Sequence, residues 1–100
     1  MGAGYVGILS VELHFPENHS LKGKRKELLS VKAQLQRRFG ASVAEVDHHD
    51  LWQRTAIAVA AVSGEQYHAR KVLHEVSKLV DRWAEVELID SELTLHYPED

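Results

Sequence analysis

Cysteine is absent from this chain, and methionine occurs only at position 1. Without cysteine, the protein cannot form disulfides, use a thiolate nucleophile, or bind zinc or an iron–sulfur cluster through sulfur. No apolar run approaches the roughly 20 residues that cross a bilayer, and the N-terminus lacks the basic start and apolar core of a signal peptide. We therefore expect a cytoplasmic protein without a membrane anchor. Its length predicts one domain over residues 1–100.

Acidic residues are nearly absent from residues 20–40, where Glu27 stands against seven lysines and arginines. From residue 84 to the end there are six acids and no lysine or arginine. The charge is therefore separated along the chain although the net charge is only −3. Such a separation bears on the choice of partners more than on the fold.

Apolar periodicity predicts four strands and two helices. The strand-like runs, with alternating or β-branched residues, are 5–15, 41–48, 54–62 and 86–97. Ser20 is placed to cap a helix that ends before Gly40. Ser63-Gly64-Glu65-Gln66 predicts a capping box, followed by a helix whose apolar stripe ends at Trp83.

The predicted order of elements is βαββαβ, which is the plan of the ferredoxin-like α+β fold. This fold has a four-stranded antiparallel sheet of order 4-1-3-2 with both helices on one face. In that topology, the start of the first helix and the loop between the second and third strands share one edge of the sheet. We expect the candidate site at this edge.

The loop at that edge contains two histidines, two aspartates, a tryptophan and an arginine. Its candidate site residues, together with a histidine that precedes the first helix, are His19, Asp47, His48, His49, Asp50, Trp52 and Arg54. We expect no metal and no cofactor, because consecutive strand residues such as His48 and His49 point to opposite faces. General acid–base chemistry by these histidines with Asp47 remains open, since histidine titrates near neutrality. For Trp52 we expect that the ring folds back over the core edge, with stacking on a base or anchoring of a partner as the alternatives.

The first helix begins with positive charge at the end where its dipole already presents partial positive charge. The candidate anion- or RNA-binding residues on this helix are Ser20, Lys22, Lys24, Arg25, Arg37 and Arg38. Two interpretations stay open. Either Asp47 and Asp50 neutralise the start of the helix within the molecule, or the helix binds a phosphate or an RNA backbone.

Two motifs, at residues 19–25 and 44–54, give the chain a resemblance to the YlxP-like bacterial family, domain of unknown function 503. The resemblance covers nearly the whole chain and implies a small ferredoxin-like domain. Members are often encoded near translation-initiation and ribosome-maturation genes, but the family supplies no reaction. It favours an acidic residue where this chain has Gly23, so the start of the helix is more positive here.

The sheet face away from the helices is less polar than a face open to water would be. The residues expected there are Val6, Ile8, Ala56, Ala58 and Ala60. We expect a homodimer in which a second copy covers this face, or another partner that does so. For the function we expect a non-catalytic binding module acting on RNA, ribosomal components or a translation-related partner. The alternative is a small-ligand or acid–base enzymatic domain at the loop edge.

Overall fold

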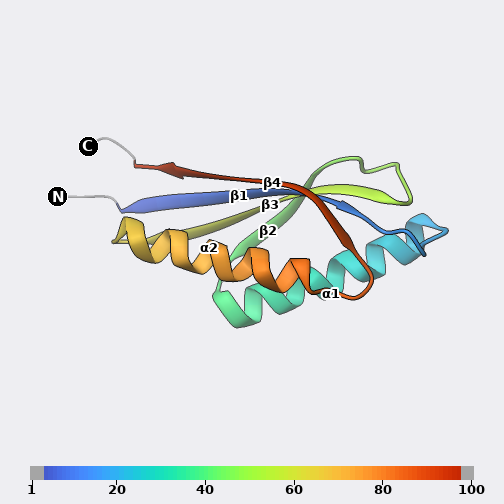
Figure 1. The fold of residues 1–100 in the computed structure, drawn as a ribbon, viewed down its shortest axis with the longest axis horizontal. Helices are drawn as coiled ribbons and strands as arrows, with labels where there is room; N and C mark the ends of the chain where they lie inside the picture. Colours follow the sequence, from blue (N-terminus) through green and yellow to red (C-terminus); the bar gives the residue numbers. More distant parts are fainter. Residues whose placement is uncertain (1–3, 98–100) are drawn as a thin grey trace.

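The computed structural model describes residues 4–97. Its elements are β1 (Tyr5–His14), α1 (Leu21–Phe39), β2 (Ser42–Asp47), β3 (Arg54–Ser63), α2 (Gln66–Asp81) and β4 (Glu87–His96). The strands form one antiparallel sheet in the order β2-β3-β1-β4. This is the predicted order 4-1-3-2 counted from the other edge, so the ferredoxin-like prediction is confirmed. Both helices lie against the same face of the sheet (Figure 1).

The core lies between this face of the sheet and the two helices. Alternate residues of β1 and β3 point into it, as the period-two pattern predicts. Leu9 pairs with Val59 and Val11 with Ile57 in the register of β1 against β3, and all four side chains are buried. The neighbouring residues in each strand point to the opposite face, which we call the outer face.

Both ends of α1 are formed as the sequence predicts. The Ser20 hydroxyl accepts a hydrogen bond from the Gly23 N–H at 3.0 Å. Gly40 follows the helix with φ of 64°, and its N–H donates to the Gln36 carbonyl at 2.9 Å. The left-handed backbone conformation at this position has little steric cost for glycine, because glycine has no Cβ.

The buried face of α1 contains a lysine. Its buried residues are Lys24, Leu28, Val31 and Leu35, spaced by four, three and four positions along one side of the helix. Only 1% of Lys24 is exposed. The prediction that Lys24 contacts an outside anion is therefore wrong, because its position on the helix turns it toward the sheet.

α2 begins without the predicted capping box. β3 continues to Ser63, which pairs with Tyr5, and Glu65 becomes the N-cap without a side-chain bond to the helix. The Ser63 hydroxyl accepts from the Glu65 N–H at 3.1 Å instead. The pairing of Ser63 in the sheet thus prevails over its capping role.

Trp83 lies just beyond the end of α2 and packs, half-buried, against the core. Its indole N–H donates to the Glu27 carboxylate of α1 at 3.1 Å. Among residues 4–97, no helix has the length and apolar character needed to cross a membrane.

Candidate functional site at the β2–β3 loop and the start of α1

The β2–β3 loop, residues 48–53, lies at the same end of the molecule as the first turns of α1 (Figure 1). Lys24 joins the two segments. Its ammonium group donates to the carbonyl oxygens of His48 at 2.7 Å, His49 at 3.2 Å and Arg54 at 3.3 Å. It also forms an ion pair with the Glu45 carboxylate at 3.0 Å. An ammonium has three donors and no acceptor, so this ring of oxygens satisfies it without water.

Glu45 is the counter-charge of Lys24 and stands on the helix-facing side of β2. The Thr55 hydroxyl of the neighbouring strand donates to the same carboxylate at 2.5 Å. Burial raises the pKa of Glu45. The hydrogen bonds from Thr55 and Lys24 lower this pKa by more than burial raises it, so the pKa lies below its ordinary value. Of the two interpretations left open for the start of the helix, neutralisation by Asp47 and Asp50 does not hold for Lys24, because Glu45 and the backbone carbonyls take that place.

A second set of side chains holds the far half of the loop. The Asn18 amide donates both to the Ser20 carbonyl at 2.7 Å and to the Trp52 carbonyl at 2.6 Å. The Gln53 amide donates to the Asn18 carbonyl at 3.1 Å, and the Gln53 carbonyl accepts from the Phe15 N–H at 2.8 Å. The loop is thereby tied to the N-cap of α1 as well as to its buried lysine.

His48 enters the loop with a left-handed backbone, at φ of 63°. This conformation is uncommon for residues other than glycine and persists where the surroundings hold it in place. Here the His48 N–H donates to the Asp47 carboxylate at 2.7 Å, and the His48 carbonyl accepts from the Leu51 N–H at 3.1 Å. The chain therefore turns sharply after β2, and the His48 ring is directed over the outer face.

On the outer face, Glu12 of β1 receives two hydrogen bonds from the segment around the loop. Nε2 of His48 donates at 2.7 Å and Nη2 of Arg54 at 2.6 Å, each to a different carboxylate oxygen. The hydrogen bond from His48, and then that from Arg54, lowers the pKa of Glu12 below its ordinary value. His48 and Arg54 are thus engaged by a residue that lies about 40 positions away in the chain.

The remaining predicted loop residues are not gathered into one cavity. His19, Asp47, His49 and Asp50 are exposed. Of these, only Asp50 lines the open hollow of about 360 Å³ that Leu51, Trp52, Gln53 and Arg54 complete. Trp52 is 55% exposed, so the expectation that its ring folds back over the core edge is wrong.

The solvent side of α1 forms a basic stripe, which we define as Lys22, Arg25, Lys26, Lys32 and Arg37. At 100° per residue these five side chains fall within an arc of about 140° opposite the buried face. α1 has no acid in its first turn. Glu27 lies on the flank, where it is bound by Trp83. Arg38 is also on the flank, with its guanidinium 5.6 Å from the centre of the Phe39 ring.

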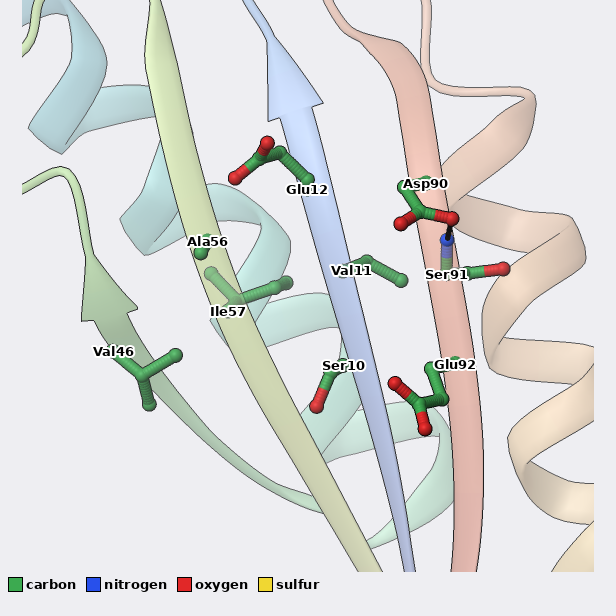
Figure 2. Close-up of a pocket in the computed structure, with 9 residues that line it drawn as sticks. All are labelled: Ser10, Val11, Glu12, Val46, Ala56, Ile57, Asp90, Ser91 and Glu92. Carbon is green, nitrogen blue, oxygen red and sulfur yellow. Dashed lines mark hydrogen bonds between the residues drawn. The ribbon is translucent and has the colours of Figure 1, made fainter.

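The outer face has an acidic end and an apolar end. Glu12, Asp90 and Glu92 stand on the adjacent strands β1 and β4 around a hollow of about 190 Å³ (Figure 2). Within residues 4–97, no group of three or more such side chains is arranged to hold a metal ion. The apolar end contains the predicted residues Val6 and Ile8, both half-buried, next to Ala60 and Val62 of β3.

Several residues of the site escaped the sequence analysis. They are Glu12, Asn18, Glu45, Gln53 and Thr55. One signal for Glu45 exists in the sequence. Val43 and Glu45 are two residues apart in β2 and therefore lie on the same side of the strand, which places the Glu45 carboxylate toward the helices. For Lys24 the signal is its spacing from Leu28, Val31 and Leu35.

Fold and site together define a ferredoxin-like α+β domain whose β2–β3 loop is held by a buried lysine. The chain belongs to the family described as "Protein of unknown function (DUF503)", whose model matches residues 6–93. It is 33% identical over 82 residues to the "Uncharacterized protein YlxP" of Bacillus subtilis (strain 168), a match that covers 82% of this chain and 89% of that protein. The predicted family resemblance is thereby confirmed.

Proposed function

We propose that this protein is a non-catalytic module of the cytoplasm that binds RNA, on its own or within a ribosomal or translation-related assembly. The observation that carries the proposal is the basic stripe of α1. Its five cations line one side of a 19-residue helix, and in the described part of the chain none of them forms an ion pair. The interpretation in which loop acids neutralise the stripe has no such pair to support it.

The basic stripe is long enough to contact the phosphate backbone of an RNA. Lys22 and Arg37 are 15 positions apart, which is about 22 Å along the helix axis at 1.5 Å per residue. Cations at the helix start also stand where the helix dipole makes positive charge unfavourable, and an anion there relieves this cost. Because phosphate contacts carry no sequence information, we expect binding that depends strongly on salt and weakly on sequence.

The test measures the affinity for a blunt-ended RNA duplex by fluorescence anisotropy at several salt concentrations. Five phosphate contacts predict a slope of log K against log salt of about −3.5 to −4.5, which is roughly a 100- to 500-fold loss between 50 and 200 mM salt. Lys22→Glu combined with Arg25→Glu should remove most of the binding at 50 mM. Both glutamates would stand near the start of α1, where negative charge is favourable, so the helix should persist.

The matched control reverses two exposed cations of the other helix, Arg70→Glu and Lys71→Glu, with the same change in net charge. It should retain affinity within a few-fold. Undetectable binding of the native protein at 50 mM salt contradicts the proposal. So does an equal loss in both double variants, which would mean that total charge rather than the stripe attracts the RNA.

The acid–base alternative has less to support it. It requires a concave site shared by His19, His49 and the two loop aspartates, whereas these residues are exposed and the adjoining hollow is open. His48 is the half-buried member of the set, and it is hydrogen-bonded to Glu12.

For the partner of the outer face we propose a second copy, restricted to the apolar end. Val62 is 72% exposed there, and it pairs with Val6 in the sheet. The acidic end, around Glu12 and Asp90, would place like charges together if it were buried against itself. Light scattering at tens of micromolar should give a dimer mass that reverts to the monomer with Val62→Lys; a monomer mass for the native protein rules the dimer out.

A further inference from the structure

Trp52 differs from the other tryptophan in having an exposed ring on a firmly held backbone. The Trp83 indole N–H is bonded to Glu27 and its ring packs against the core. Trp52 is 55% exposed as a residue, and no hydrogen bond to its indole is present in the part of the chain that the structure describes. A buried tryptophan usually has a hydrogen-bond partner for its indole N–H. The Trp52 side chain has no such partner within residues 4–97 and is available at the surface.

The backbone around Trp52, in contrast, is tied on both sides. Carbonyl groups that accept a hydrogen bond belong to His48, His49, Trp52, Gln53 and Arg54. Apart from the Leu51 N–H, which donates to His48 within the loop, the donors are Lys24, Asn18 and Phe15, all in segments outside the loop. The loop therefore holds the backbone at Trp52 in place, and an aromatic side chain with two rotatable bonds loses little conformational freedom when a ligand binds to it.

The backbone at Trp52 is linked to the start of α1, where the basic stripe begins. The Asn18 amide is bonded to both the Trp52 carbonyl and the carbonyl of Ser20, the N-cap of α1, at 2.6 and 2.7 Å. Lys22 and Arg25 follow within the first two turns of that helix. A hollow of about 360 Å³ opens beside Trp52, with Asp50, Leu51 and Gln53 among the residues that line it.

From this arrangement we infer that Trp52 is a stacking platform for an unpaired nucleobase of the RNA whose phosphates contact the start of α1. The inference rests on the proposed function and narrows its substrate class to RNA in which an unpaired nucleotide adjoins a duplex. Aromatic rings stack on any base because every base has a π-face, so the platform selects for an unpaired base rather than for its identity. The Asp50 carboxylate adds an acceptor for a base amino group.

The experiment compares two RNA duplexes of the same sequence, one blunt at both ends and one carrying three unpaired adenosines at a 3′ end. For the native protein, the overhang should raise the affinity about 5- to 150-fold, as base–aromatic stacking of roughly 1 to 3 kcal/mol predicts at 1.4 kcal/mol per tenfold. Trp52→Ala should abolish this gain and leave the affinity for the blunt duplex unchanged. The substitution should not disturb the loop, because each tie at position 52 goes to the backbone.

Two further variants separate stacking from loss of bulk. Trp52→Phe should retain most of the gain, since phenylalanine also stacks, and Tyr67→Ala, which removes an exposed aromatic ring from α2, should retain it fully. In the Trp83→Phe variant, Trp52 is the remaining tryptophan, and its fluorescence should be quenched by the duplex with the overhang and not by the blunt one.

Failure of this inference is distinguishable from failure of the proposed function. If the overhang gives no gain while Lys22→Glu with Arg25→Glu still removes binding, the stacking site is refuted and the basic stripe stands. Equal weakening of binding to both duplexes by Trp52→Ala also refutes it, and so does an unchanged affinity of that variant for both, as expected if the indole anchors a protein. If neither duplex binds at 50 mM salt, both the stacking site and the RNA-binding proposal are refuted.

Discussion

Lys24→Met tests the claim that a buried ammonium organises the candidate site. Methionine is close in volume and equally unbranched, so the packing against Leu28 is preserved while the charge and its donors are removed. The carbonyls of His48, His49 and Arg54 then lose the hydrogen bond from Lys24, and Glu45 retains only the Thr55 hydroxyl. The variant therefore measures the polar contacts rather than the volume of the side chain.

The magnitude follows from the exposure of the two partners. Removing one member of a buried ion pair costs about 3 to 5 kcal/mol, because the remaining charge is left without compensation. Glu45 is 19% exposed and can regain some water, so we place the loss near the lower end, at about 3 kcal/mol. Domains of this size have a free energy of unfolding of about 5 to 15 kcal/mol, and each kcal/mol shifts the Tm by about 4 to 8 °C. The expected decrease in Tm is roughly 12 to 24 °C.

The assay is urea denaturation followed by circular dichroism, with thermal melts as a second measurement. Lys26→Met is the matched control, since it changes the same residue type on the exposed side of the same helix and should stay within about 0.5 kcal/mol. A double-mutant cycle with Glu45→Gln should show coupling of at least about 1 kcal/mol. A loss below 1 kcal/mol for Lys24→Met, or equal losses in both backgrounds, would refute the assignment of Lys24 as the centre of the site.

Three further outcomes follow from single residues. The folded-state pKa of Glu45 is lowered, so its contribution is present above the ordinary glutamate pKa of about 4.3 and is lost as the pH falls through the folded value. Glu45→Gln should therefore cost about 1 to 3 kcal/mol at pH 7 by urea denaturation, and the difference from the native protein should shrink toward pH 3; a constant difference would contradict this. Gly7→Ala should cost about 1 to 3 kcal/mol, because a Cβ there lies 2.6 Å from the buried Leu73 Cδ1, and a Tm equal to that of the native protein would show that the core yields freely. Gly40→Ala should cost about 1 to 2 kcal/mol because of the positive φ at this position. Steric overlap is not the cause, because a Cβ there meets nothing within 4 Å. Gly40→Asn should recover part of the loss in the same melts.

The fold was predictable because apolar periodicity marks every element and the caps of α1 agree with it. Leu9, Val11 and Leu13 alternate, Ser20 and Gly40 mark the ends of α1, and the order of elements leaves few topologies. The start of α2 was not predictable from the Ser63-x-x-Gln66 pattern, since the same serine also continues a strand and pairing with β1 prevails.

The position of the site could be predicted from the sequence, but the contacts between its side chains could not. The shared edge of the β2–β3 loop and α1 follows from topology alone. The contacts within it depend on long-range pairs, such as Glu12 with His48 and Lys24 with Glu45, that local patterns do not encode. Charge alone was misleading for Lys24, because a lysine among basic neighbours resembles a surface residue until its spacing from the apolar positions is considered.

The crowded contact between Gly23 and Asn18 has a consequence for how this family can vary. A Cβ at position 23 would collide with the Asn18 side-chain oxygen, the same side chain whose amide ties the N-cap of α1 to the carbonyl of Trp52. A homologue with an acidic residue at this position gains a capping partner for its helix but must give up asparagine in this pose at position 18. The two positions should therefore change together, and sequences would divide into those that stabilise the helix locally and those that fasten the loop to it.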